Sequence, residues 1–446
     1  MELRHRIGQH TIDIEISDAG EAVAMQNQLS DLCRQRLYPA LEQLFDRFAD
    51  GETWLRIDRL ELDLGTVTPT DWQQQLVEKT VLELEKALRQ WHPATAGRLP
   101  ALIPLQAADR ESFLYFLETG SLPWNSPVQQ PADWENRLEP TTDLFRQVVG
   151  LGQRKPLVLL RLVWQFSGSF LNRLTAFRKA SHSEVGLLDA VWQAVAPYLP
   201  DSAAGRQTFR HYIRLASAAR SSANSPVLDW LKPGIDAFVP VPQRAATEQA
   251  LREIPKAIAH NQDPTEPVDQ WLPNSLADGP AAHYISNAGL VLLHPFLHSL
   301  FRELGLLAET RWVDQTAQNR AVLLCQYAVT GQPVMPESDL LLAKILCGMP
   351  PEWPVEAELA LMPNEEAEVR KLLEAVVSHW KALKNASVAS VQESFLQRDG
   401  KLSRKDGGWR LQVDPQTIDI LLDRLPWGFS LIKSAFMSEI LYVEWR

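Results

Sequence analysis

The spacing of apolar residues predicts a strand and then a helix at the start of the chain. Ile12, Ile14 and Ile16 alternate with polar residues, which is the period of a half-buried strand. The stretch Glu21–Phe48 has helical spacing, with apolar residues every three or four positions. Pro39 lies inside it and is expected to kink or divide the helix near Leu37, because proline lacks a backbone N–H.

A second strand and a second helix follow in the same region. The sequence TWLRIDRLELDLG at residues 53–65 alternates, but its phase slips by one residue at Asp58–Arg59, where we expect a β-bulge. Pro69 then opens a helix with one marked face, made of Leu76, Thr80, Leu84 and Leu88. Residues 1–95 are therefore predicted to form an N-terminal α/β domain with a βαβα unit.

The middle of the chain changes from a helical pattern to a proline-rich one. Residues 96–220 are predicted to form a wholly helical domain, including helices at Arg110–Glu118, Leu157–Phe166 and Val185–Val195. Nine of the 30 prolines then fall between Ser221 and Pro280. Because proline interrupts regular structure, residues 221–283 are predicted to be a linker or surface strap.

Residues 284–446 return to helical spacing and end in short strands. Four helices are expected at residues 296–304, 317–328, 337–346 and 364–383, the last capped by Asn364, and Ser387 can cap a fifth. The turn Asp406-Gly407-Gly408 and two alternating segments, 409–413 and 441–445, indicate a small sheet. The predicted fold class is α+β and predominantly helical.

Composition narrows the functional classes. The 446 residues are 45% hydrophobic and 22% charged, as in a folded protein, and the net charge is −11. That charge argues against a general nucleic-acid or anionic-membrane binder. Three cysteines are too few for a disulfide scaffold and fit a reducing, cytoplasmic compartment. We see no export signal at the N-terminus.

One uncharged stretch, Gly279–Phe301, is long enough to span a bilayer. It contains three histidines and Pro295, and its continuous apolar part is only Ala288–Leu293. We therefore predict a buried globular segment and no membrane span.

Candidate chemistry is sparse. His294 and His298 are four residues apart but lack further metal ligands, so they are expected to be structural. Ser167-Gly168-Ser169 lacks the flanking glycines of a nucleophile elbow, and Gly150-Leu151-Gly152 lacks the third glycine of a phosphate loop. The carboxylates of Asp58, Glu61 and Asp63 are expected on a solvated strand face. We predict no catalytic, cofactor or metal site.

Tryptophan usage is more informative, with 15 tryptophans and only seven tyrosines. Tryptophan buries a large area and often anchors protein interfaces, although core packing explains many such residues. The candidate protein-interaction residues are Trp124, Trp230, Trp271 and Trp427. Two of them, Trp124 and Trp427, end the tripeptide Leu-Pro-Trp.

Several segments in order resemble one family, the tape measure proteins of bacterial contractile injection systems, which are phage-tail-like particles. The segments are LYPALEQLFDRFADGETWLRIDRLELDLG (37–65), FLYFLETGSLPW (113–124), AGLVLLHPFLHSLFRELGLL (288–307), CG (347–348), HW with LK (379–384), SFLQRDGKL (394–402) and DILLDRLPWG (419–428). They span nearly the whole chain, with the poorest match in the proline-rich region.

The resemblance implies a non-enzymatic structural or assembly role with tube, sheath or baseplate proteins as partners, and cargo as a further candidate. In this family a tape measure sets tail length by occupying the tube lumen. One continuous helix of this chain would reach roughly 670 Å, but its helix breakers and strands are incompatible with such a rod. A compact scaffold, chaperone or cargo adaptor is therefore an alternative, and an unrecognised hydrolase is a further one.

Overall fold

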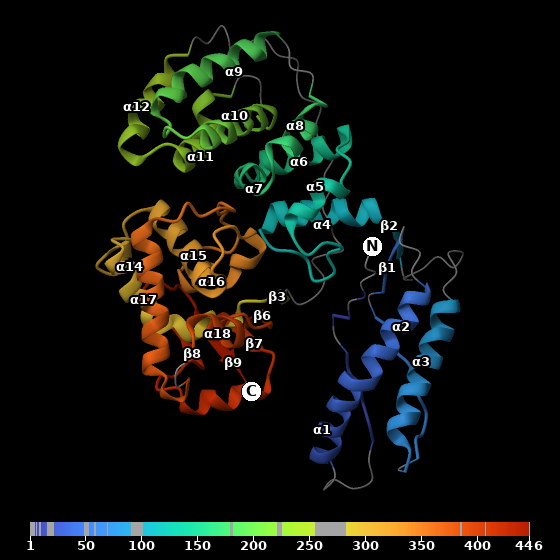
Figure 1. Cartoon of the computed structure of the whole chain (residues 1–446). Helices are drawn as coiled ribbons and strands as arrows, with labels where there is room; N and C mark the ends of the chain where they lie inside the picture. Colours follow the sequence, from blue (N-terminus) through green and yellow to red (C-terminus); the bar gives the residue numbers. More distant parts are fainter. Residues whose placement is uncertain are drawn as a thin grey trace. The chain divides into compact units, whose positions relative to one another are not determined.

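The computed structural model describes residues 5, 7–8, 10–15, 22–48, 53–57, 59–68, 70–90, 101–178, 182–220, 225–254, 282–383, 386–405 and 407–445. The chain forms two compact units. The N-terminal unit comprises Met1–Asp109 and Asn125–Pro127, and the main unit comprises Arg110–Trp124 and Val128–Arg446. Helices dominate and short strands accompany them, which confirms the predicted fold class (Figure 1).

The N-terminal unit is built on the helices that the sequence predicts. Helix α1 (Ala22–Leu32) continues through a π-helical turn, η2 (Cys33–Leu37), into α2 (Tyr38–Phe48). The Tyr38 N–H bonds to the Cys33 carbonyl, five residues back, immediately before Pro39. The predicted interruption near Leu37 is therefore confirmed as a change of helical register.

Helix α3 (Trp72–Gln90) packs beside α2 (Figure 1). The predicted face of Leu76, Thr80, Leu84 and Leu88 is buried throughout, with each side chain 4–8% exposed. Leu84 and Leu88 share a core with Leu37, Leu41 and Leu44 of the preceding helical stretch. Two amphipathic helices thus bury their apolar stripes against each other.

The predicted strands of this unit are partly wrong. No strand forms over Thr11–Glu15, and Ile16 and Asp58, with the expected bulge, lie outside the described residues. The second strand is shorter than predicted: β1 spans Thr53–Arg56 and pairs antiparallel with β2, Ala101–Pro104. β2 also falls in a region predicted to be wholly helical.

The first half of the main unit is a helical assembly around one core. Its elements are α4 (Leu105–Thr119, which begins in the N-terminal unit), η3 (Pro131–Asp133), α5 (Trp134–Arg137), α6 (Thr142–Arg154), α7 (Leu157–Gln165), α8 (Gly168–Thr175), α9 (His182–Val195), η4 (Ala196–Tyr198), α10 (Ala203–Ala218), α11 (Val227–Phe238) and α12 (Val241–Arg252). Side-chain oxygens of Thr141, Ser167 and Ser202 cap α6, α8 and α10. Aromatic residues contribute to the core, and the ring of Phe113 packs edge to face with those of Trp134 and Phe170.

The structure corrects the prediction of a linker at the start of the proline-rich region. Helices α11 and α12 occupy residues 227–252 and contribute Leu231, Ile235 and Leu251 to the helical core. Three of the prolines fit because Pro226 and Pro240 precede the helices and Pro242 lies in a first turn, where no N–H is needed. The fourth, Pro233, lies inside α11, which continues to Phe238. Residues 255–281 lie outside the described residues. The four-part domain division stays a prediction, and its helical and C-terminal parts belong to one compact unit.

The second half of the main unit combines helices with the five-stranded sheet. Its elements are β3 (Ala282–Ile285), η5 (Ala288–Leu293), α14 (His294–Glu303), β4 (Leu307–Ala308), β5 (Arg311–Trp312), α15 (Gln315–Thr330), η6 (Glu337–Leu340), α16 (Leu341–Leu346), α17 (Pro363–His379), η7 (Lys381–Leu383), α18 (Val388–Val391), η8 (Gln392–Leu396), β6 (Gly400–Lys405), β7 (Gly408–Val413), η9 (Thr417–Arg424), β8 (Leu431–Ile432) and β9 (Ile440–Glu444). The predicted capping role of Asn364 is wrong: α17 begins one residue earlier, and Glu365 accepts the Met362 N–H at 2.8 Å. Ser387 caps α18 as predicted.

The sheet has the strand order β3-β6-β7-β9-β8. The predicted turn connects β6 and β7 as an antiparallel hairpin with Gly407 at φ +77°, and β9 pairs with β7 in parallel. The two terminal alternating segments are therefore neighbours in one sheet, as expected. Leu402, Leu411 and Val443 lie opposite one another on its inner face and are buried.

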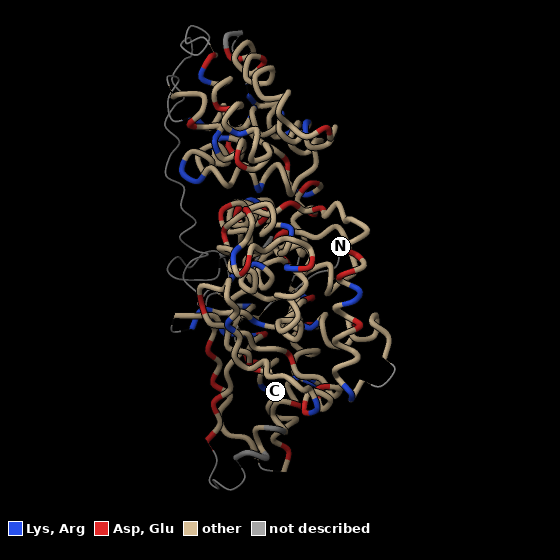
Figure 2. The backbone as a smooth tube through the Cα atoms, turned by 90° about the vertical axis from the view of Figure 1, so that its left-hand side faces the viewer, with Lys and Arg blue, Asp and Glu red and all other residues tan. Residues whose placement is uncertain are grey.

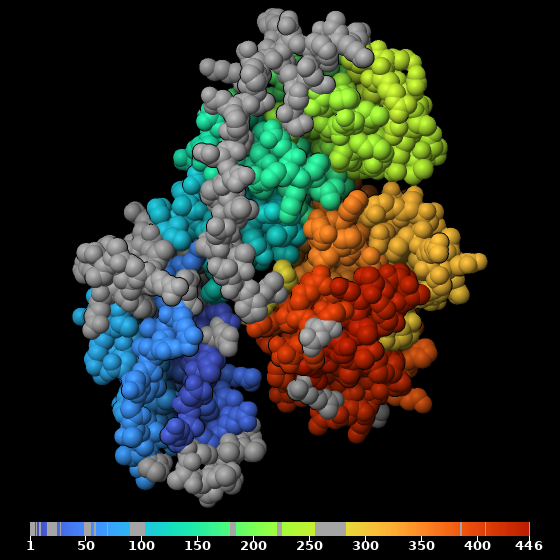
Figure 3. Space-filling view, turned by 180° about the vertical axis from the view of Figure 1, so that it is seen from behind, coloured from blue at the N-terminus to red at the C-terminus, as the bar shows by residue number. Residues whose placement is uncertain are grey.

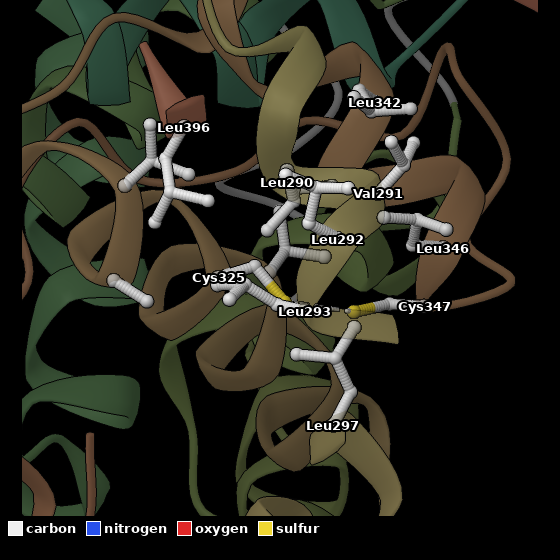
Figure 4. Close-up of a cluster of buried hydrophobic side chains, with 14 of the residues drawn as sticks. Leu290, Val291, Leu292, Leu293, Leu297, Cys325, Leu342, Leu346, Cys347 and Leu396 are labelled. Carbon is white, nitrogen blue, oxygen red and sulfur yellow. Dashed lines mark hydrogen bonds between the residues drawn. The ribbon is translucent and has the colours of Figure 1, made fainter. Parts of the chain in front are cut away.

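The uncharged segment that is long enough for a bilayer lies in the core of this half. Every residue of η5, Ala288–Leu293, is fully buried among α15, α16 and η8 (Figure 4). A Cβ on Gly289 would lie 1.7 Å from the Phe395 carbonyl oxygen, so only glycine permits this approach of η5 and η8. Among the described residues, no helix is long and apolar enough to cross a membrane.

Candidate functional site

The structure places the four predicted interaction tryptophans in different settings. Trp124 follows α4 and is 40% exposed. Trp230 is half-buried on α11, against the helical core. The Trp427 indole N–H donates to the Leu292 carbonyl at 3.1 Å, and its ring packs edge-on against Phe296. Trp271 lies outside the described residues. Trp230 and Trp427 thus belong to different cores, and an interaction role for the four stays a prediction.

A buried ionic cluster connects the helical half of the main unit with the C-terminal half. It consists of Arg161 on α7, Glu337 on η6 and Lys344 on α16, each side chain at most 1% exposed. Arg161 donates through Nε to Glu337 Oε2 at 2.9 Å and through Nη2 to Oε1 at 3.1 Å. Lys344 Nζ donates to Glu337 Oε1 at 2.5 Å. One carboxylate therefore binds two cations from different elements.

Backbone carbonyls complete the cluster. Arg161 also donates to the carbonyls of Leu117 and Glu352, both at 2.5 Å, and Lys344 donates to that of Pro351 at 3.0 Å. These bonds satisfy donors that would otherwise be buried without partners. The guanidinium of Arg161 therefore bridges the end of α4 and the loop after α16.

The shape of the surrounding backbone is adapted to the cluster. A Cβ on Gly120 would lie 2.5 Å from Glu337 Oε1 and 2.9 Å from Arg161 Nη2, and the residue has φ +77°. The predicted helix stop at Gly120 is thus confirmed, and the same glycine leaves room for the ion pair. Gln165, one turn after Arg161, donates to the Val355 carbonyl at 2.8 Å and accepts the Glu337 N–H at 2.9 Å.

Burial changes the electrostatics of this region. Burial lowers the pKa of Lys344, the nearby Glu337 opposes that shift, and Arg161 adds to it. Burial also raises the pKa of Asp339, on the same short helix as Glu337, to about 6. With all three groups charged, the cluster has two positive charges and one negative charge, and Glu352 adds a further attraction on Lys344. Elsewhere, acidic and basic residues are interspersed along the chain (Figure 2).

A second buried ion pair joins Arg398, which precedes β6, to Asp419 on η9. Arg398 donates to both oxygens of Asp419, at 2.7 and 3.0 Å, and the Trp445 indole N–H donates to Asp419 Oδ2 at 3.1 Å. Burial by itself would raise the pKa of Asp419, but the hydrogen bonds from Arg398, the Gln416 N–H and Trp445 hold it below its usual value. The C-terminal strand is thereby tied to η9.

Neither cluster was predicted from the sequence, although one signal was present. Arg161 is the single charge in the apolar run LVLLRLVW, and Lys344 is the single charge in LLLAKILC. Charged residues are almost never fully buried unless they are paired, so a lone charge in such a run indicates a buried partner. The sequence does not identify that partner, because Glu337 is 176 residues from Arg161.

The candidate chemistry of the sequence has structural explanations. His294 Nδ1 donates to the Val291 carbonyl at 2.9 Å, and burial lowers its pKa. Ser167 caps α8, and Asp63 accepts the Gly65 N–H at 2.9 Å. Within the described residues, no group of three or more histidine, cysteine, aspartate or glutamate side chains could hold a metal ion.

Two thiols meet in the C-terminal core. Cys325 Sγ and Cys347 Sγ are 3.9 Å apart and fully buried (Figure 4). Burial, together with the neighbouring Cys325, raises the pKa of Cys347 well above its usual value. Because the thiolate is the reactive form, these groups are arranged as apolar packing residues and not as nucleophiles.

Comparison with known proteins identifies the family of this chain. No curated protein and no solved structure matches the chain. The family model described as contractile injection system tape measure protein matches residues 4–445, essentially the whole chain. The chain therefore belongs to the contractile injection system tape measure protein family.

Proposed function

We propose that this chain acts during assembly of a contractile injection system as a compact protein-binding component. The family identifies the particle as a contractile injection system. The observation that supports a compact form is the buried cluster of Arg161, Glu337 and Lys344. The proposed mechanism is protein–protein contact without catalysis. The proposed site of action is the cytoplasm during assembly, and retention in the finished particle is compatible with it.

Compactness has an energetic basis. Separating the two halves of the main unit would break the two hydrogen bonds from Arg161 to Glu337 and those that join Gln165 to Val355 and Glu337. Residues of α7 and η6 are joined directly by these bonds. The helical half (green) and the C-terminal half (orange and red) lie next to each other in Figure 3. An extended form must therefore overcome a specific, geometrically defined contact in addition to two hydrophobic cores.

Candidate partners are the tube, sheath and baseplate proteins, with cargo as a further one. The contact residues proposed from the sequence are Trp124, Trp230, Trp271 and Trp427. Trp124 fits this role best, since it is 40% exposed and large aromatic residues are enriched at interface hot spots. Trp427 donates its N–H to Leu292 and fits a structural role better.

A ruler mechanism is the second candidate, favoured by the family description. It requires that tail length scales with the length of the chain. As a single helix the chain would span roughly 670 Å. The compact and the extended mechanisms both require the particle but differ in this scaling.

The experiment is deletion of the gene followed by electron microscopy and mass spectrometry of purified particles and assembly intermediates. We expect short, misassembled or empty particles, rescued by the wild-type chain, and the chain itself in the intermediates. A deletion strain with particles of normal length, number and content would contradict the proposal.

A further inference from the structure

The five-stranded sheet covers the core with one face only. Along each strand, inner residues alternate with outer ones, and the pairing aligns the outer residues in rows. One row runs Tyr284, Lys401, Gln412 and Glu444, and the next runs Ala282, Ser403, Arg410, Tyr442 and Leu431. All of these are half-buried or exposed, so no described element of the main unit packs over this outer face.

The outer face is positively charged in an acidic chain. It carries Lys401, Lys405 and Arg410 against the single carboxylate Glu444, a balance of +2, whereas the whole chain has −11. Glu444 is already engaged: Arg410 donates to its two oxygens at 2.7 and 2.6 Å, and Gln412 donates at 3.2 Å. Among the described residues, no carboxylate lies within ion-pair distance of Lys401 or Lys405, although the charge of Lys405 acts on Glu444 from further away. Lys405 instead lies over the Tyr442 ring at 4.9 Å.

Large apolar and aromatic groups flank these charges. Tyr284 on edge strand β3 is 54% exposed, and Leu431 on the opposite edge strand β8 is 59% exposed. Tyr442 lies between them. Tyrosine and other aromatic residues are enriched at protein interfaces, and basic side chains beside them attract complementary charge.

We propose that this outer face binds an acidic segment of a partner protein, with the apolar side chains of the segment on Tyr284, Tyr442 and Leu431 and its carboxylates on Lys401 and Lys405. This inference rests on the proposed assembly function and names the chemistry of one partner.

Two other occupants fit the face less well. A second copy of the chain would meet it with the same positive charge if the face paired with itself, as in a two-fold dimer, and like charges oppose that arrangement. Nucleic acid favours a face of many unpaired arginines and lysines. Here Arg410 is paired with Glu444, and the carboxylate lies within the same row as Lys401.

The test uses photo-crosslinking in cells that assemble the particle. The crosslinking amino acid p-benzoylphenylalanine replaces Tyr284 in one full-length variant and Leu431 in another, and mass spectrometry identifies the linked peptides. We expect both positions to link to the same partner protein, through a segment with more Asp and Glu than Lys and Arg. Adding the double substitution Lys401→Glu/Lys405→Glu to each crosslinking variant should lower the yield of the crosslinked product about tenfold.

A matched control carries the same change of net charge elsewhere. Lys371→Glu/Lys381→Glu reverses two exposed lysines outside the sheet and should leave the yield unchanged. Thermal denaturation of all variants checks that the fold is kept. Links to nucleic acid or to a second copy, an unchanged yield in the Lys401/Lys405 variant, or no link from either position would overturn the inference. If assembly still fails in the deletion strain, the proposed function survives that outcome.

Discussion

Replacing Glu337 by glutamine tests the buried ionic cluster most directly. Glutamine has nearly the same shape but no charge, so the variant leaves the Arg161 guanidinium and the Lys344 ammonium buried without the carboxylate that binds both. Both cations are at most 1% exposed, and water cannot replace the carboxylate without opening the contact. The perturbation is therefore electrostatic and leaves packing almost unchanged.

The expected magnitude follows from the burial. Breaking a buried pair from one side costs about 3–5 kcal/mol. The main unit has about 330 residues, and at about 2.1 cal/mol/K per residue its unfolding entropy is about 0.7 kcal/mol/K. The midpoint of thermal unfolding should then fall by about 4–7 °C.

The assay is thermal and urea denaturation followed by circular dichroism and tryptophan fluorescence. Glu366→Gln is the matched control, because Glu366 is 52% exposed and forms a solvent-exposed ion pair with Arg370 at 3.4 Å. Its free energy of unfolding should change by less than about 0.5 kcal/mol. Lys344→Met should cost less than Glu337→Gln, since it removes the excess positive charge and keeps the Arg161–Glu337 pair.

A loss below about 1 kcal/mol for Glu337→Gln would refute the reasoning, because a pair that contributes so little behaves like an ordinary solvent-exposed ion pair. An equal loss for Lys344→Met would also contradict it. In that case the stability of the region would come from packing and not from the shared carboxylate.

Burial elsewhere in the chain leads to three further predictions. Leu84→Ala should destabilise the N-terminal unit by about 2–5 kcal/mol, whereas Leu82→Ala, at a 51% exposed position of the same helix, should cost under about 0.5 kcal/mol, as measured by urea denaturation. The thiols of Cys325 and Cys347 should resist a thiol reagent at pH 8 in the native chain and react once it is unfolded; fast native labelling would contradict their burial. Because the pKa of Asp339 is raised to about 6, the folded state binds more protons than the unfolded state between about pH 4 and 6, so stability falls as pH rises through that window. Asp339→Asn should abolish this pH dependence. The free energy of unfolding of the variant should exceed that of the wild type by up to about 3 kcal/mol at pH 8 but not at pH 4, and an equal difference at both pH values would refute the prediction.

Local periodicity was sufficient for elements whose stability comes from one amphipathic face. The buried face from Leu76 to Leu88 on α3 and the hairpin at Gly407 were both predictable, because helical spacing and turn type depend on residues that are close together in the sequence. The same holds for the interruption before Pro39.

Elements that depend on distant partners were not predictable in the same way. The alternation at Ile12 and Ile14 forms no strand, since a strand needs a neighbour that periodicity does not supply. Proline density suggested a linker at residues 226–252, but three of the four prolines there lie before a helix or in its first turn, and α11 accommodates the fourth, Pro233, in its interior. The partner of Arg161 is far along the chain, so the ionic cluster emerged only in the structure.

The most direct test of the central claim is tail length in particles assembled with a lengthened chain. A 30-residue helical insert between Asp201 and Ser202 extends an exposed turn between η4 and α10. If the folded, compact chain supports assembly, tails should keep their wild-type length in electron micrographs. A ruler that works as an extended helix would lengthen the tail by about 45 Å, and that increase would contradict the account.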